Sequence, residues 1–98
     1  MDKKDDYNIY IGGKPFMNYV TAVVMQFTTQ GASTVVVKSR GKFISRAVDV
    51  AEVVKSRFMK DLVDLGEIKI GSEEFTNNEN RQVRVSTMEI TLTKRTAA

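Results

Sequence analysis

The sequence contains no cysteine and no histidine, and these two absences remove much of the chemistry that enzymes use. Without cysteine, the chain can form neither a disulfide framework nor a thiolate metal site, which fits an intracellular protein. Without either residue, most general-base, nucleophilic and zinc-binding arrangements cannot be built. Carboxylate or lysine chemistry remains open, but no spacing of these residues points to it. We therefore expect a protein that is not an enzyme and that uses neither a metal nor a cofactor.

Long apolar runs are also absent. No segment approaches the roughly 20 apolar residues of a transmembrane helix, and the N-terminal MDKKDDYN lacks the apolar stretch of a signal peptide. We expect a cytoplasmic protein without a membrane partner. The 98 residues, 42% of them hydrophobic, suit one domain over residues 1–98 with a modest core. Residues 1–6 are charged and are expected to be disordered.

Positive charge is in mild excess, with 15 basic and 12 acidic residues and a net charge of +3. Such an excess indicates a partner only if the basic residues gather in one place.

Two strand–helix units are predicted in the first half of the chain. The run 8–11 reads as a strand that ends at Gly12-Gly13, and Pro15 is expected to open a helix, because the first helical position needs no N–H. The run 34–38 is β-branched and predicts a buried strand. A second helix is predicted over 43–57. The apolar positions expected to face the core are Phe16, Tyr19, Val20, Val23, Val24 and Phe27 in the first helix, and Ile44, Ala47, Val48, Ala51 and Val54 in the second.

The second half predicts a hairpin of two strands, 67–75 and 83–94, joined by the polar segment TNNENR. In the last strand the apolar residues change from odd positions (Val83, Val85) to even ones (Met88, Ile90, Leu92). One face of a strand keeps one parity, so we expect a bulge or a change of buried face near Ser86-Thr87.

The resulting order, βαβαββ, predicts an α/β protein of the two-layer α+β type. Right-handed crossovers join parallel strands, and the final hairpin adds an antiparallel pair. The simplest packing places both helices on one face of a four-stranded mixed sheet. The other face of the sheet is then left for solvent or for a partner.

Two basic loops precede the predicted helices. The first, IGGKP, carries Lys14, and the second, KSRGK, carries Arg40 and Lys42, with Arg46 one helical turn later. Glycines beside a helix N-terminus can seat a phosphate. The alternative is an ordinary turn with solvated bases, which the local sequence favours for the first loop and which explains the second loop equally well. The first loop is not a Walker loop. In βαβ order, both loops leave the same end of the sheet, so we expect Lys14, Arg40 and Lys42 to cluster.

Two further features allow alternative interpretations. Arg81 and Arg84 lie near the hairpin tip, where a long arm could enter a groove, but the nearby acidic residues favour a solvated loop as much. Phe58 follows the second helix, and its local sequence favours a place in the core. The alternative is an exposed contact between protein units.

Four segments of the chain, IGGKPFMNYV, KSRGKFISRAVDVAEVVKSRF, EIKIGSEEF and RQVRVSTMEITL, resemble the archaeal Alba chromatin proteins over residues 8–94. The resemblance implies the βαβαββ fold that is also found in the C-terminal domain of a bacterial translation initiation factor. It implies a homodimer whose central bases lie on the backbone of double-stranded DNA while two hairpin arms embrace the duplex. Side-by-side dimer–dimer contacts along DNA, and RNA binding in many members, are also implied.

The family pattern transfers to individual residues of this chain. Lys14 matches the lysine before the proline, Phe58 matches the aromatic of dimer–dimer contacts, which reverses the local preference for core, and Gly13 stands where many members have another lysine. An acetylation switch described for some members uses the lysine that Gly13 replaces. The resemblance therefore does not carry that switch over to this chain, where Lys14 would be only a substitute. The residues predicted to bind nucleic acid are Lys14, Asn18, Tyr19, Arg40, Lys42, Arg46, Arg81 and Arg84.

The function predicted from sequence is therefore coating of double-stranded DNA by a chromosome-associated chromatin protein with little sequence preference, and binding of RNA as well. The first alternative is a mainly RNA-binding protein with a role in RNA folding or in a ribonucleoprotein. The second, from another class, is a protein-interaction scaffold on which the basic loops are incidental.

Overall fold

The computed structural model describes residues 6–95, and the predicted disorder of residues 1–6 falls almost wholly outside that range. The elements follow the predicted order, and two short helical turns flank the second helix. Their bounds are β1 (Asp6–Tyr10), α1 (Phe16–Thr28), β2 (Thr34–Arg40), the 3-10 turn η2 (Gly41–Phe43), α2 (Ile44–Val53), the π-type turn η3 (Val54–Phe58), β3 (Val63–Thr76) and β4 (Gln82–Lys94).

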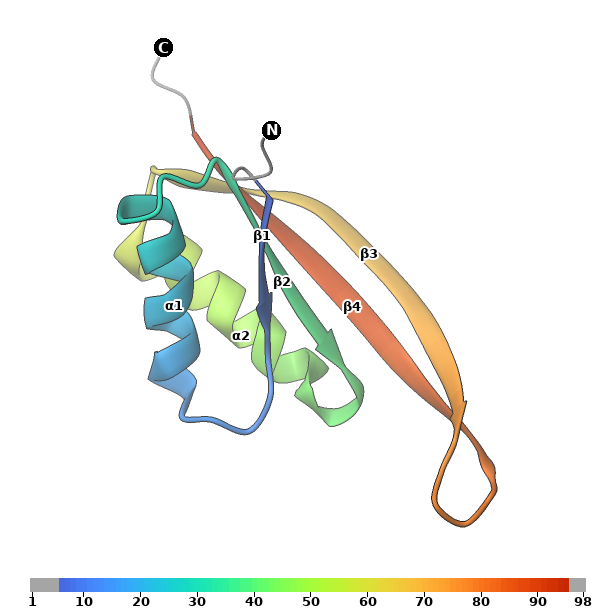
Figure 1. Ribbon diagram of the computed structural model, residues 1–98. Coiled ribbons are helices and arrows are strands. Elements are labelled where there is room, and N and C mark those ends of the chain that lie inside the picture. The colour runs from blue at the N-terminus through green and yellow to red at the C-terminus, as the bar shows by residue number, and fades with distance from the viewer. Residues whose placement is uncertain (1–5, 96–98) are drawn as a thin grey trace.

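The four strands form one mixed sheet in the order β1-β2-β4-β3. Strands β1 and β2 are parallel, whereas β4 is antiparallel to both of its neighbours. Figure 1 shows both helices on one face of this sheet, with the ends of β3 and β4 extending beyond them as a long hairpin. The predicted two-layer α+β fold is confirmed.

The core lies between the helices and the sheet. Val20, Val23 and Phe27 of α1 are at most 1% exposed and share the core with Val35 and Val37 of β2. The predicted apolar face of α1 is confirmed, because its buried members are Tyr19, Val20, Val23 and Phe27.

The second helix differs from its prediction in two ways. It ends in the π-type turn η3, where the Met59 N–H donates to the Val54 carbonyl at 2.8 Å. Met59 is thereby buried, whereas Phe58 is 52% exposed, so the local preference for Phe58 in the core is wrong. The predicted core position of Val48 is also wrong, because Val48 is 41% exposed and Val50 is buried in its place.

The predicted bulge near Ser86-Thr87 does not exist, because the pairing of β3 with β4 is regular there. The alternative, a change of covered face, is what occurs. Val83 and Val85 are half-buried on one face, whereas Ile90 and Leu92 are buried on the face that the helices cover. The helices reach only the inner half of the hairpin, so the outer half has no reason to keep the same apolar face.

A bulge is present in β3 instead, between Leu65 and Ile68. Leu65 pairs with Leu92, and Ile68 pairs with Ile90, so one extra residue of β3 is accommodated between them. Gly66 lies in this bulge, where a Cβ atom would stand 3.3 Å from the Thr93 hydroxyl oxygen. The bulge keeps Leu65 and Ile68, which differ in parity, on the same face of the sheet.

Candidate nucleic-acid interface

The loops that follow β1 and β2 lie side by side at one end of the sheet. The Ile11 N–H donates to the Lys38 carbonyl at 2.9 Å, which extends the pairing of β1 with β2 into the first loop. From α2, Arg46 Nη2 donates to the Lys14 carbonyl at 2.8 Å. The structure therefore brings Lys14 and Arg46 together.

Tyr19 holds the first loop in shape. Its hydroxyl oxygen accepts the N–H groups of Gly12 and Lys14, each at 3.0 Å. The ring is only 8% exposed, and the Arg46 guanidinium carbon lies 6.0 Å from its centroid. This geometry supports a role for Tyr19 in positioning the loop that carries Lys14, and does not favour a direct contact with a ligand.

Arg40 and Lys42 lie at the end of β2 and in the turn that follows it. Arg40 is exposed, but its Nη1 donates to Glu73 Oε1 of the hairpin at 2.6 Å. Lys42 is also exposed, and its Nζ lies 5.5 Å from the ring centroid of Phe43. A phosphate would have to displace a carboxylate to reach Arg40, whereas Lys42 is exposed in the turn beside the Phe43 ring.

The hairpin carries Arg81 and Arg84 away from these loops, as Figure 1 shows for its tip. Arg84 Nε donates to Ser72 Oγ across the two strands at 3.4 Å. The tip is closed by Asn77, whose Oδ1 accepts the N–H groups of Glu79 and Arg81. Within one chain, the two arginines and the loop bases are therefore separate groups.

Two predicted residues lie outside both groups. Asn18 is exposed in the first turn of α1, where its backbone N–H donates to the Pro15 carbonyl at 3.0 Å. Phe58 lies at the end of η3, and Leu62, which is 53% exposed, follows it closely in the chain.

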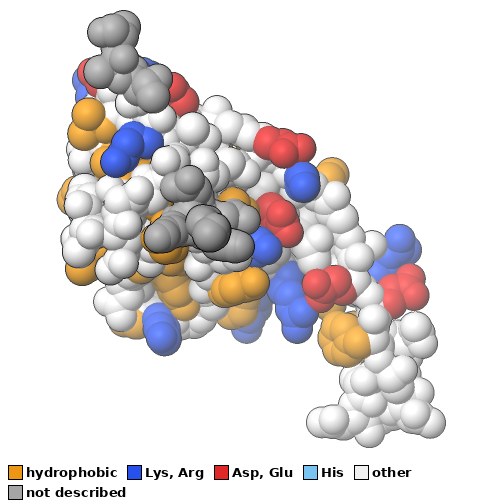
Figure 2. All heavy atoms as spheres, turned by 45° about the horizontal axis from the view of Figure 1, so that its top comes forward, with side chains coloured by type: hydrophobic (Ala, Val, Ile, Leu, Met, Phe, Trp, Pro, Cys, Tyr) orange, Lys and Arg blue, Asp and Glu red, His pale blue; other side chains and the backbone are white. Residues whose placement is uncertain are grey.

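Sequence reasoning did not group Tyr10, Lys38 and Glu89 on the open face of the sheet, which is the face without helices. Lys38 Nζ lies 3.8 Å from Glu89 Oε2 and 5.7 Å from the ring centroid of Tyr10. The polar positions that alternate with buried valines in β2 were the available signal, because alternate residues of a strand point to opposite faces. Figure 2 shows positive and negative side chains interspersed along the visible face, without a continuous basic surface.

A cluster of ion pairs stands at the opposite end of the sheet from the basic loops. Arg95 binds Asp64 through Nη2 at 2.5 Å and also lies 3.7 Å from Asp61. The hydrogen bond from Arg95 lowers the pKa of Asp64 below its ordinary value. Within residues 6–95, no group of three or more acidic, histidine or cysteine side chains is arranged to hold a metal ion. Over the same range, no helix is both long and apolar enough to cross a membrane.

These features define a class of small basic α+β proteins whose charged loops gather at one end of the sheet, beside a projecting hairpin. The family model that matches the chain, over residues 8–72, is that of Alba. The chain belongs to the Alba family.

Similar proteins agree with this assignment over most of their length. The DNA/RNA-binding protein Alba of Nanoarchaeum equitans is 58% identical over 88 residues, which are 89% of this chain and 97% of that protein. The DNA/RNA-binding protein Alba of Methanococcus maripaludis is 47% identical over 91% of this chain and 99% of its own. The structure of Alba from Thermoplasma volcanium superposes with a TM-score of 0.80 at 43% identity, and covers 88% of this chain and 98% of that one.

Proposed function

We propose that the protein binds double-stranded DNA without sequence specificity, coats it as a chromosome-associated chromatin protein, and also binds RNA. The observation that carries this proposal is the joining of two basic loops at one end of the sheet, where Arg46 fixes the carbonyl of Lys14. The relatives in Nanoarchaeum equitans and Methanococcus maripaludis bear the name DNA/RNA-binding protein, which supports both ligands.

The mechanism is electrostatic. Bases such as Lys14, Arg40 and Lys42 neutralise phosphates and release counterions, and this term carries no sequence information. If a dimer contacts about six phosphates, log K against log salt has a slope near −5 on B-DNA. A flat salt dependence, or strong discrimination among random duplexes, would contradict this mechanism.

Charge reversal at matched positions tests the location of the interface. Lys14→Glu and Lys42→Glu are expected to weaken duplex binding more than Lys60→Glu, which makes the same change of charge near the opposite end of the sheet. Fluorescence anisotropy with a labelled duplex measures the three affinities. Equal losses would show that only net charge matters. No retention of the wild-type protein on duplex DNA at about 0.15 M salt would favour the scaffold alternative.

The apolar surface between α2 and the sheet is suited to bind a second copy of the chain. A groove of about 120 Å³ between α2 and the strands is lined by apolar side chains and by the stems of two charged ones. Ile68, which lines the groove, is 48% exposed, and Ile70, two residues further along β3, is 79% exposed. A patch of this kind on a small protein indicates an interface, and a two-fold axis would cover it on both copies at once. The lining residues are Val48, Ala51, Glu52, Lys55, Leu65, Ile68, Met88 and Ile90.

The homodimer doubles the bases and supplies two hairpin arms. Ile70→Glu is expected to convert the dimer to a folded monomer, because Ile70 is exposed in the single chain. Sedimentation velocity distinguishes the two states, and Met17→Glu, at an exposed position on α1, is the control. An unchanged sedimentation coefficient for Ile70→Glu would remove this interface from the proposal.

The arms would flank the duplex and place Arg81 and Arg84 near the minor groove, where narrow stretches attract arginine. The tip from Thr76 to Arg81 is closed by its own hydrogen bonds and contains no apolar anchor. Replacing residues 76–80 by a two-residue turn should weaken duplex binding and leave the dimer intact. Arms whose amide exchange is the same with and without DNA would contradict their role.

A further inference from the structure

The open face of the sheet carries one row of side chains that crosses all four strands. Tyr10 of β1 is in register with Lys38 of β2, Lys38 with Glu89 of β4, and Glu89 with Lys69 of β3. Residues in register on neighbouring strands point to the same face. The row therefore reads aromatic, positive, negative, positive.

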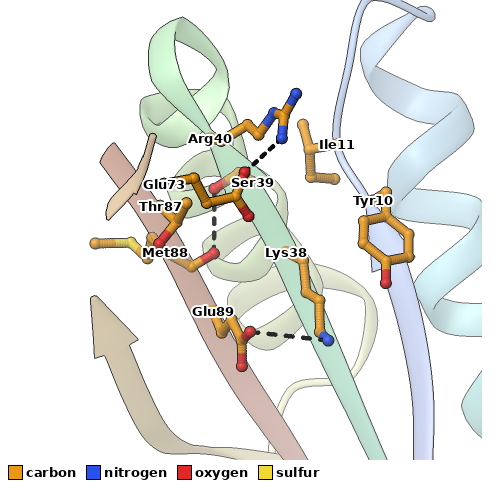
Figure 3. Close-up of a pocket in the computed structure, with 9 residues that line it drawn as sticks. All are labelled: Tyr10, Ile11, Lys38, Ser39, Arg40, Glu73, Thr87, Met88 and Glu89. Carbon is orange, nitrogen blue, oxygen red and sulfur yellow. Dashed lines mark hydrogen bonds and ion pairs between the residues drawn. The ribbon is translucent and has the colours of Figure 1, made fainter. Parts of the chain in front are cut away.

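The row borders a hollow of about 370 Å³, which is within the range of about 300–1,000 Å³ that small-molecule sites occupy. Tyr10, Lys38 and Glu89 lie side by side across three strands, and the Arg40–Glu73 pair closes one end of the hollow (Figure 3). The Tyr10 ring is 69% exposed.

Stability does not explain this arrangement. An aromatic ring that is mostly exposed gains little from burial. The Arg40–Glu73 pair joins two exposed side chains, and the Lys38–Glu89 pair joins a half-buried side chain to an exposed one at 3.8 Å, so neither pair is buried and each contributes only marginally. In both ion pairs on this face, Lys38–Glu89 and Arg40–Glu73, a phosphate could take the place of the carboxylate beside the cation. An exposed ring beside exchangeable cations is the combination that stacks an unpaired base and holds its backbone.

We propose that the open face binds a single-stranded nucleic acid, with one unpaired base stacked on Tyr10 and the flanking phosphates on Lys38 and Arg40. This inference rests on the proposed nucleic-acid-binding function and adds a second site to it. A duplex keeps its bases stacked inside and cannot present one to a ring on a sheet. The other loop bases and the arm thus contact duplexes, the open face contacts unpaired strands, and Arg40, which lines the hollow at the end of β2, can bind a phosphate of either ligand.

The carboxylates give the site a further property. When phosphates take Lys38 and Arg40, Glu89 and Glu73 lose their partners and become acceptors beside the stacked base. A carboxylate accepts hydrogen bonds from the amino groups of bases, as it does from cytosine in DNA grooves. The face is therefore expected to prefer strands rich in bases with exocyclic amino groups over oligouridine.

The test compares two labelled ligands by fluorescence anisotropy: an unstructured RNA of about 12 nucleotides, which suits the site sizes of single-strand-binding folds, and a random-sequence duplex DNA. Tyr10→Ala should weaken RNA binding by about 5- to 150-fold, the range that loss of base stacking produces, and should leave duplex binding nearly unchanged. Tyr10→Phe keeps the ring and should restore RNA binding. Asn8→Ala, on the same strand and face, is the matched control, and circular dichroism checks the fold of each variant.

Each other result contradicts the inference. Equal losses on both ligands would mean that Tyr10 serves a shared interface, and no loss would mean that the face is not used. If Tyr10→Phe bound RNA as weakly as Tyr10→Ala, the hydroxyl group would account for the binding, and stacking on the ring would not. If the wild-type protein bound the duplex but not the RNA, this site would be refuted and the DNA-binding proposal would stand. Failure on both ligands would refute both.

Discussion

The Tyr19 hydroxyl offers a direct test of whether the loop that carries Lys14 must be held in shape. Tyr19→Phe removes the oxygen that accepts the Gly12 and Lys14 N–H groups and leaves the ring in place. The ring contact with Arg46, at 6.0 Å, is therefore retained. The variant therefore removes two hydrogen bonds and leaves the packing of the ring and the net charge unchanged.

The magnitude follows from the environment of the two N–H groups. A typical hydrogen bond contributes about 0.5–1.5 kcal/mol, and a buried donor that loses its partner costs about 1–3 kcal/mol. Gly12 is half-buried and Lys14 is exposed, so water can replace the oxygen at Lys14 more readily than at Gly12. We expect a loss of about 1–2 kcal/mol in the free energy of unfolding. For a domain of this size, the loss corresponds to a fall in Tm of about 5–15 °C.

Duplex binding should weaken as well, because a loosened loop must be ordered when DNA binds. Ordering the backbone costs about 1–2 kcal/mol per residue. The free-energy cost of ordering one residue therefore corresponds to a loss of about 5- to 30-fold in affinity. Thermal unfolding and anisotropy at one fixed protein concentration measure the two effects. Tyr10→Phe removes the same hydroxyl from an exposed ring and is the control. A lower Tm with unchanged duplex affinity would refute the idea that the loop must be pre-ordered.

Three further outcomes follow from the contacts described above. Glu73→Gln should raise duplex affinity, because it frees Arg40 from its carboxylate; an unchanged or lower affinity in anisotropy would show that Arg40 does not bind the phosphates of a duplex. Phe58→Ala should leave Tm nearly unchanged, since the ring is 52% exposed, and should reduce cooperative clustering on DNA in gel shifts; a large drop in Tm would restore a structural role. The lowered pKa of Asp64 means that its pair with Arg95 stabilises the fold above the ordinary carboxyl pKa of 3.8, and that this contribution is lost as pH falls through the lowered value. The Tm difference between wild type and Arg95→Gln should therefore shrink in acid, and a difference that is constant from pH 7 to pH 2 would refute the pairing.

Much of the fold could be predicted because turns and periodicity agree along the chain. Gly12-Gly13, Gly31 and the polar tip separate segments whose apolar spacing is clear. The start of β3 could not be predicted, since Asp64 and Gly66 interrupt its alternation. Val48 and Val50 lie on opposite edges of the apolar stripe of α2, and only the surrounding elements decide which edge is covered.

The candidate site was predictable to the extent that it depends on topology. Parallel strands deliver their following loops to one end of a sheet, so the approach of Lys14 to Arg46 follows from the βαβ order. The pairing of Arg40 with Glu73 could not be predicted, because it depends on the register of the hairpin against β2. The positioning role of Tyr19 was hidden too, because its spacing is that of an ordinary core residue.

The bulge in β3 affects two properties of the strand in different ways. The side chains that face the helices depend on the alternation of residues along the strand, whereas the direction of the strand depends on its local bend and twist, which a bulge changes. Loss of one residue at 66–67 would restore regular alternation, keep Leu65 and Ile68 on the same face, and straighten the strand. Insertion or loss of one residue at the bulge in β3 can therefore change the direction in which the hairpin projects, without changing which side chains the hairpin exposes on each face.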